Sequence, residues 1–245
     1  MLEVRGIKKA YKDKTVLDGV SFSLNPGQSL GVAGHNGSGK STLLSIIAQV
    51  LPADEGEVLL NNVNLSKNRE FAGEALGYAP QEDSLLGDLT VRDTLFFWQR
   101  AYGLPVSKVF EPGSPAAILG LEPIQKSRVS KLSGGARKRV SIAIALLRQP
   151  KLLLLDEALS SLDRHYRLRL EEYISDFRRA GGIILYCGHY TGELIGLCDR
   201  ILILRDGQKV FDGEAIHFPT DKDELDRLLN PLNSLSSLNS LECSS

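Results

Sequence analysis

The sequence contains the stretch Gly34-His35-Asn36-Gly37-Ser38-Gly39-Lys40-Ser41-Thr42, which matches in full the pattern Gly-x4-Gly-Lys-[Ser/Thr] of a phosphate-binding loop. An apolar run at residues 30–33 precedes it and predicts a buried strand. After it, apolar residues recur at helical spacing from residue 43 to residue 51, until Pro52. The motif therefore lies between a strand and a helix, which is the context that such a loop requires.

The residue types of this stretch suit the binding of a nucleotide. Its glycines allow backbone N–H groups to wrap around an anion, and the following helix offers its positive N-terminal end. Lys40 can reach the β- and γ-phosphates, and the Ser41 hydroxyl can ligate Mg²⁺. The alternative is a glycine-rich turn that matches the pattern by chance.

Composition narrows the class of protein. The chain has 245 residues, of which 29 are Lys or Arg and 30 are Asp or Glu, so its net charge is −1. This length suits one nucleotide-binding domain with an inserted subdomain. No global basic field favours nucleic acid as a partner. The three cysteines, Cys187, Cys198 and Cys243, match no metal-binding spacing and suit packing in a reducing cytosol.

Short strands are expected on both sides of the phosphate loop. Residues 2–24 alternate as antiparallel strands, residues 57–60 followed by Asn61-Asn62 predict a hairpin, and residues 77–81 predict another short strand. The chain starts with a strand-like segment and not a signal peptide, and no apolar run approaches the roughly 18 residues of a membrane span. We therefore expect a soluble chain.

Thr90 and Asp93 have the spacing of a capping box, which predicts a helix start. The apolar residues that share one face of this helix, and are expected in the core, are Val91, Leu95, Trp98 and Tyr102. Phe96 and Phe97 lie off that face, so either the helix is buried on two sides or a partner covers the two rings. Residues 103–131 predict short helices and loops of an inserted α-subdomain.

Two further segments suit phosphate chemistry. Ser133, Gly134 and Gly135 begin a helix that is expected to run until Pro150, and they form a second anion site. An unbroken apolar run at residues 152–155 predicts a buried parallel strand that ends in Asp156 and Glu157. Asp156 is placed to hold the hydration shell of Mg²⁺, and Glu157 to orient or deprotonate an attacking water. A chance acidic pair is the alternative.

Three single residues could contact a ligand, although each has a structural alternative. Tyr11 lies in a polar break where its ring could stack on an adenine, or it is an ordinary residue at a strand end. Gln81 could touch Mg²⁺ or a water, or belong to an ordinary loop. His189 follows a predicted buried strand at residues 183–186, at the same sheet edge as the carboxylates, or it is structural.

In their order along the chain, these residues resemble the nucleotide-binding subunit of ATP-binding cassette (ABC) transporters, up to about residue 217. The resemblance implies an α/β fold: a P-loop NTPase core, with a mostly parallel sheet and flanking helices, an N-terminal antiparallel β-subdomain and an inserted α-helical subdomain at about residues 84–148. Residues 1–217 would form this domain. Residues 218–245 would form a C-terminal extension, which is rich in Ser and Leu and is expected to be flexible or to include a short docking segment.

The resemblance also assigns a role to each motif. Residues 34–42 look like Walker A, residues 152–156 like Walker B, and residues 161–163 like the D-loop. The single-residue assignments are Tyr11 for adenine stacking, Gln81 for the Q-loop, Glu157 for the catalytic carboxylate and His189 for the switch loop. Residues 132–136 look like the family signature, in which Ser133, Gly134 and Gly135 supply the donors. In this family the signature covers the γ-phosphate of ATP bound to the other subunit.

The implied protein is an ATPase whose two cassettes, identical or different, close on two ATP molecules in a head-to-tail dimer. It would drive a separate integral-membrane subunit and lie at the cytoplasmic face of the membrane. Residues 89–93 and 198–201 look most like ABC-2 type export subunits. The signature usually ends in Gln and here ends in Ala136, which leaves the donors for binding in place but puts fine control of closure in doubt.

Two other functions remain open at this stage. One is an ABC ATPase without a transporter, such as a subunit for Fe–S assembly, which co-purification with a soluble and not a membrane partner would reveal. The other is a regulatory cassette that binds ATP without hydrolysing it. Ala136 permits that function, whereas Glu157 and His189 argue against it.

Overall fold

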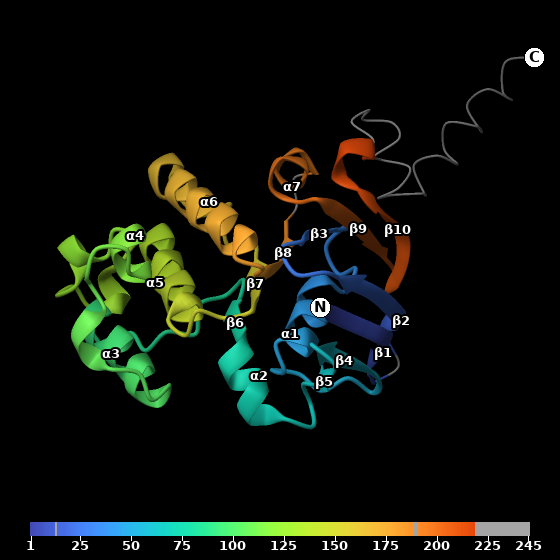
Figure 1. Ribbon diagram of the computed structural model, residues 1–245, viewed down its shortest axis with the longest axis horizontal. Coiled ribbons are helices and arrows are strands. Elements are labelled where there is room, and N and C mark those ends of the chain that lie inside the picture. The colour runs from blue at the N-terminus through green and yellow to red at the C-terminus, as the bar shows by residue number, and fades with distance from the viewer. Residues whose placement is uncertain (13, 189–190, 219–245) are drawn as a thin grey trace, which may run out of the picture.

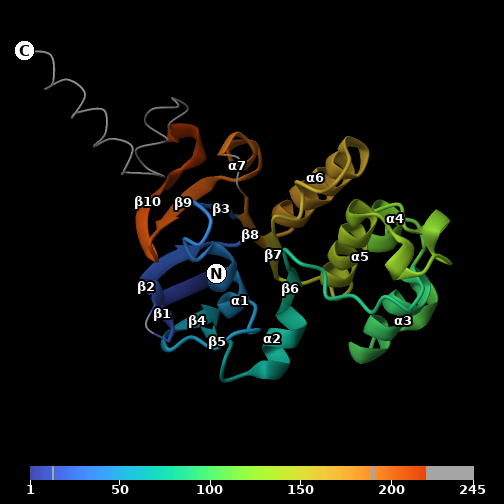
Figure 2. The ribbon, with the colours of Figure 1, turned by 180° about the vertical axis from the view of Figure 1, so that it is seen from behind.

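The computed structural model describes residues 1–12, 14–188 and 191–218. His189, Cys243 and the whole of residues 219–245 lie outside the described residues. Figure 1 shows strands gathered on one side of the molecule and a group of helices on the other, and Figure 2 shows the same division from behind.

The strands form two sheets. The first is antiparallel, in the order β2-β1-β4-β5. The second has the order β10-β9-β3-β8-β7-β6, in which the strands from β9 to β6 are parallel and β10 is an antiparallel edge. The strand bounds are β1 Leu2–Tyr11, β2 Lys14–Leu24, β3 Ser29–Ala33, β4 Glu55–Leu60, β5 Val63–Asn64, β6 Leu76–Ala79, β7 Leu152–Asp156, β8 Ile183–Cys187, β9 Arg200–Arg205 and β10 Gln208–Glu214.

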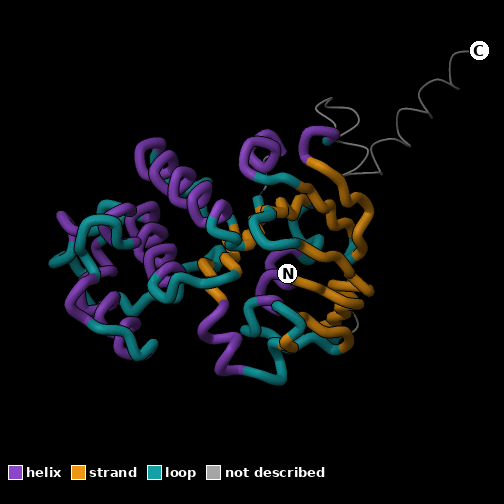
Figure 3. The backbone as a smooth tube through the Cα atoms, viewed as in Figure 1, coloured by secondary structure: helices purple, strands orange, loops and turns teal. Residues whose placement is uncertain are grey.

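The helices occupy two places. Helix α1 (Lys40–Ile47) packs between the sheets, since its buried residues share one apolar cluster with strands of both. Figure 3 shows that the end of the molecule far from the antiparallel sheet holds helices and loops. The other helices are α2 Arg69–Ala75, α3 Val91–Ala101, α4 Pro115–Ile118, α5 Gly134–Leu146, α6 Arg164–Arg179 and α7 Thr191–Leu197, with 3-10 turns at Val106–Lys108, Glu122–Ile124, Val129–Lys131 and Ala215–His217.

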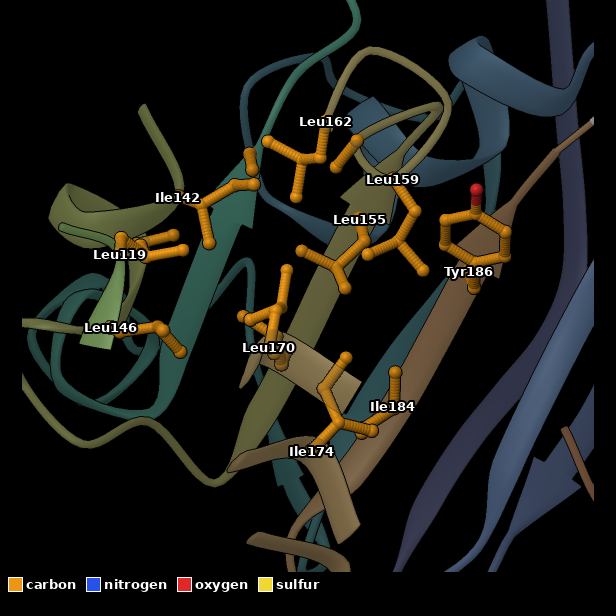
Figure 4. Packing of buried hydrophobic residues seen from close by; sticks show 14 of the residues in the cluster. Leu119, Ile142, Leu146, Leu155, Leu159, Leu162, Leu170, Ile174, Ile184 and Tyr186 are labelled. Carbon is orange, nitrogen blue, oxygen red and sulfur yellow. The ribbon is translucent and has the colours of Figure 1, made fainter. Parts of the chain in front are cut away.

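Strand β7 separates two hydrophobic cores. Leu153 and Leu155 face the cluster that includes α5 and α6, whereas Leu152 and Leu154 face the cluster around α1. All four are fully buried, which confirms the predicted buried parallel strand. Figure 4 shows Leu155 in this packing, on the side of the sheet where Leu170 of α6 also lies. The sheet therefore holds the end of β7, with its carboxylates, rigidly.

Two helices end earlier than the apolar spacing predicts. Helix α1 ends at Ile47, because Gln49 has a φ of 61° and the N–H groups of Val50 and Leu51 both bond to the carbonyl of Ser45. Val50 is consequently 63% exposed. Helix α5 likewise ends before Pro150, and helix α2 lies in a segment for which no helix was predicted.

Helix α3 begins as predicted but buries a somewhat different face. The Thr90 hydroxyl caps the helix by accepting a bond from the N–H of Asp93 at 3.1 Å. The residues that are fully buried are Val91, Thr94, Leu95 and Gln99, whereas the predicted core residues Trp98 and Tyr102 are only partly buried. Thr94 tolerates burial because its hydroxyl donates to the carbonyl of Thr90 at 2.9 Å. Phe96 is half-buried and Phe97 is 51% exposed.

The described part of the chain contains no helix with the length and apolarity that crossing a membrane requires. Its two cysteines, Cys187 and Cys198, are free and buried, as packing residues are.

Candidate functional site

The glycine-rich stretch forms a loop that only glycine permits at two of its positions. It connects the end of β3 to the start of α1. Gly34 and Gly39 have φ values of 154° and 104°. A Cβ on Gly34 would lie 2.3 Å from the carbonyl oxygen of Leu204, and one on Gly39 would lie 2.7 Å from that of Val16. The loop is thus held between β9 and β2, in a shape that presents backbone N–H groups and a helix N-terminus.

Lys40 is buried to 5% exposure and lies over this loop. Its Nζ donates to the carbonyl oxygens of Gly34 at 2.8 Å and His35 at 3.1 Å. His35 in turn places its Nε2 3.6 Å from a carboxylate oxygen of Asp206, in the turn between β9 and β10. The buried hydroxyl of Ser38 has no hydrogen-bond partner among the described residues. The positive charge of Lys40 therefore lies at the mouth of the anion-binding loop.

Asp156 ends β7 beside this loop and is 1% exposed. Burial raises the pKa of its carboxyl, the Ser41 hydroxyl opposes the shift, and the adjacent charge of Glu157 adds to it. Its Oδ1 has no hydrogen-bond partner within the described chain. A buried carboxylate oxygen of this kind favours a nearby cation.

Glu157 follows with a φ of 50°, which is uncommon for a residue with a side chain. Its N–H donates to the carbonyl of Cys187 at 2.9 Å, so β8 fixes its backbone. Its Oε2 accepts a hydrogen bond of 2.9 Å from Nε2 of Gln81, in the loop after β6. Two residues that are 76 positions apart in the sequence therefore meet at one sheet edge.

One pocket brings together Lys40, Ser41, Gln81 and Glu157. The residues that line it are Lys14, Val16, Asn36, Gly37, Gly39, Lys40, Ser41, Thr42, Gln81 and Glu157. Sequence reasoning did not assign Lys14 and Val16 to the site. They come from the start of β2, where an alternating strand pattern gives no sign that one end borders the loop.

Several predicted site residues do not line that pocket: Gly34, His35 and Ser38 of the loop itself, the buried Asp156, and two elements elsewhere in the chain, Tyr11 and the turn at residues 133–135. Tyr11 ends β1 and is 45% exposed, with Nζ of Lys9 at 5.7 Å from its ring centroid. The turn Ser133-Gly134-Gly135 begins α5, where the Ser133 hydroxyl accepts a bond from the N–H of Ala136 at 3.2 Å. A Cβ on Gly135 would lie 2.7 Å from the carbonyl oxygen of Ser161, so this turn packs closely against the loop before α6.

Comparison with known proteins agrees with this geometry. The sequence profile of the ABC transporter family matches residues 17–160. The chain is 35% identical to the linearmycin resistance ATP-binding protein LnrL of Bacillus subtilis, over 87% of this chain and 69% of that protein. It is 33% identical to the Nod factor export ATP-binding protein I of Rhizobium etli, over 86% and 67% of the two chains.

Solved structures show the same fold. The ATP-binding subunit of an ABC transporter superposes with a TM-score of 0.80 at 27% identity, over 93% of this chain and 92% of that one. A dimeric ATP-binding cassette bound to ADP and Pi superposes with a TM-score of 0.79 at 23% identity, over 89% of this chain and 100% of that one. The predicted P-loop NTPase fold is thereby confirmed, and the chain belongs to the ABC transporter family as one of its ATP-binding, ATP-hydrolysing subunits.

Proposed function

We propose that this subunit powers an exporter by hydrolysing ATP between two cassettes and driving a separate integral-membrane subunit. The observation that carries the proposal is the single pocket in which Lys40 and Ser41 of the phosphate loop face the hydrogen-bonded pair of Gln81 and Glu157. Export is supported by the relatives, one of which is named for Nod factor export and another for linearmycin resistance.

The pocket supplies the groups that phosphoryl transfer to water needs. Residues 34–42 offer backbone N–H groups to the phosphates, and Lys40 exchanges its bonds to loop carbonyls for bonds to phosphate oxygens. Glu157 orients or deprotonates the attacking water, and Gln81 holds its carboxylate. From the family resemblance, Tyr11 stacks on the adenine and His189 assists catalysis.

Mg²⁺ fits the oxygen donors at this edge of the sheet. Ser41 and Gln81 would hold it, together with the phosphates, and Asp156 would hold its hydration shell. Mg²⁺ usually keeps several of its waters and takes few protein ligands, so these three side chains suit it. When bound, Mg²⁺ neutralises charge on the β- and γ-phosphates.

The signature turn, Ser133-Gly134-Gly135, serves the nucleotide of the second cassette, identical or different. Ser133, Gly134 and Gly135 line no part of the pocket around Lys40. They nevertheless present a capped helix N-terminus, in which a Cβ on Gly134 would meet no atom within 4 Å, so a phosphate can approach it. A fold neighbour is a dimer bound to ADP and Pi, which supports the same arrangement here.

The membrane subunit docks on α3. Phe97 is exposed there, beside a pocket lined by Leu89, Asp93, Phe96, Phe97, Arg100 and Ala101. This surface, which combines two aromatic rings and aliphatic side chains with the charged Asp93 and Arg100, suits a short amphipathic helix. The proposal places residues 1–217 as one cassette, with residues 84–148 as its helical subdomain, at the cytoplasmic face of a membrane.

ATP hydrolysis by purified wild-type protein, Lys40→Ala and Lys67→Ala tests the proposal. Lys40→Ala should weaken ATP binding and abolish phosphate release, because the positive charge on the β- and γ-phosphates is lost. Lys67 is an exposed lysine outside the pocket, so its variant should hydrolyse ATP normally. Unchanged turnover in Lys40→Ala would refute the assignment of the phosphate loop.

A further inference from the structure

Lys138 is a buried lysine that the motifs do not explain. It lies on α5, is 4% exposed, and extends its side chain to the loop after β6. Its Nζ donates to the carbonyl oxygens of Pro80 and Gln81, each at 2.7 Å, and lies 3.2 Å from a carboxylate oxygen of Asp83. An ammonium group has three N–H donors and no acceptor; two of its hydrogen bonds go to these backbone carbonyls, and the carboxylate of Asp83 lies close enough to form an ion pair.

The loop that Lys138 holds is the one that reaches the reaction centre. The two carbonyls that accept its hydrogen bonds and the carboxylate that pairs with it all lie within residues 80–83, directly after β6. The side chain of Gln81 is exposed and donates to Glu157 at 2.9 Å, whereas its backbone carbonyl is bound by Lys138. Lys138 of α5 therefore fixes the backbone position from which the Gln81 amide reaches Glu157.

Helix α5, which carries Lys138, begins at the signature turn. Gly134 and Lys138 are four residues apart on α5, so they lie on one face of the helix. Helical side chains tilt toward the N-terminus, which brings the Lys138 side chain toward Ser133 and Gly134. Because a helix moves as a rigid unit, a displacement of the turn shifts Lys138, and with it the backbone of Gln81.

We propose that Lys138 is a positioning residue that couples the contact between the signature turn and ATP to the Gln81–Glu157 pair. The inference rests on the proposed function, since it assumes that Glu157 acts on water and that the turn meets a nucleotide. It adds a mechanical link between the two sites, which runs through one buried ammonium group and the backbone of Gln81. Lys138 touches neither the nucleotide nor the water in this scheme.

The test compares Lys138→Met with Lys126→Met, a matched change of an exposed lysine in the same group of helices. Met keeps an unbranched stem of four atoms and removes the ammonium. We expect kcat for ATP hydrolysis to fall about 10- to 100-fold, as for the loss of other groups that orient a reacting residue, while the affinity for a fluorescent ATP analogue changes by less than about threefold. Lys126→Met should match the wild type in both measurements.

A double variant sharpens the result. If Lys138 acts through Gln81, adding Lys138→Met to Gln81→Ala should lower kcat little further, since the group that it positions is already gone. Independent, multiplicative losses would overturn the inference, and so would an unchanged kcat in Lys138→Met. A fall in ATP affinity equal to the fall in kcat would also overturn it, because a general structural role would produce that result.

If Lys138→Met does not fold, Asp83→Ala decides the question, because it removes the carboxylate that lies 3.2 Å from the ammonium and keeps the lysine. We expect a lower kcat with unchanged ATP affinity, and an unchanged kcat would overturn the inference. The Lys40→Ala measurement tests the proposed function separately. Loss of hydrolysis in Lys40→Ala together with normal hydrolysis in Lys138→Met would refute only the role of Lys138.

Discussion

Replacing Glu157 with Gln isolates the function of one carboxylate. Oε2 of Glu157 accepts a bond from Nε2 of Gln81 at 2.9 Å, and a Gln at position 157 keeps a carbonyl oxygen that can accept the same bond. The backbone already adopts a φ of 50° there, and the two residue types tolerate this conformation about equally. The change is therefore confined to the loss of one negative charge and of one base.

The magnitude follows from this geometry. Loss of a general base costs about 10²- to 10⁴-fold in rate, which is about 2.7 to 5.4 kcal/mol on the barrier. Binding should not suffer, because the pocket loses a negative charge that faces the phosphates. Folding should not suffer either, since the charge of Glu157 raises the pKa of the buried Asp156 and its removal relieves that repulsion.

The assay is phosphate release at saturating ATP, with Glu82→Gln as the control, since Glu82 is an exposed carboxylate next to Gln81. In a cassette that pairs with itself, the Glu157→Gln protein should also elute as a dimer with ATP on size exclusion. Turnover within threefold of the wild type would refute the role of Glu157. A Glu157→Gln protein that stays monomeric at saturating ATP, while the wild type pairs with itself, would refute the shared site.

Four further substitutions test other parts of the protein. Ser133→Arg should preserve ATP binding and lower the rate of hydrolysis about 10²- to 10³-fold. Because Ser133 also caps α5, the substitution should lower the free energy of unfolding by about 1 kcal/mol. Normal turnover would exclude the signature turn from the nucleotide site. Phe97→Ala should leave the isolated subunit folded but weaken binding of the membrane subunit about 3- to 12-fold. About half of the 1.5 to 3 kcal/mol from burying a Phe ring is still available at 51% exposure. The half-buried Phe96 packs against the core, so Phe96→Ala should instead lower the melting temperature, and normal assembly of Phe97→Ala would refute docking on α3. Asp156→Asn should raise the melting temperature of the nucleotide-free protein at neutral pH. Burial raises the pKa of Asp156, so its charge destabilises the fold increasingly as the pH rises through that pKa. If the gain in melting temperature persisted unchanged in strong acid, this cause would be refuted.

Much of the fold was predictable because local pattern and long-range packing agree. The apolar run of β7, the hairpin of β4 and β5, and the caps at Thr90 and Ser133 all appear as the sequence predicts. The predictions failed where apolar spacing continued past the end of a helix, as at Val50, where a left-handed residue ends α1. Helix α2 was missed because a segment of seven residues carries little periodic signal.

The phosphate loop could be identified from the sequence because its chemistry is local. Backbone N–H groups, glycine conformations and Lys40 all lie within nine consecutive residues, so their spacing alone specifies an anion site. The carboxylates at the end of a buried strand are a local signal of the same kind. These residues, and with them the family, were determined by the sequence by itself.

Only the tertiary structure decided which distant groups meet. The bond between Gln81 and Glu157, the entry of Lys14 into the pocket, and the burial of Lys138 against the loop at residues 80–83 depend on the order of strands in the sheet and on how α5 packs. A pattern along the sequence does not predict such pairs, because each partner is an ordinary polar residue in its own segment. Burial strengthens such contacts, because it removes water and leaves each polar or charged group to interact with its protein partners.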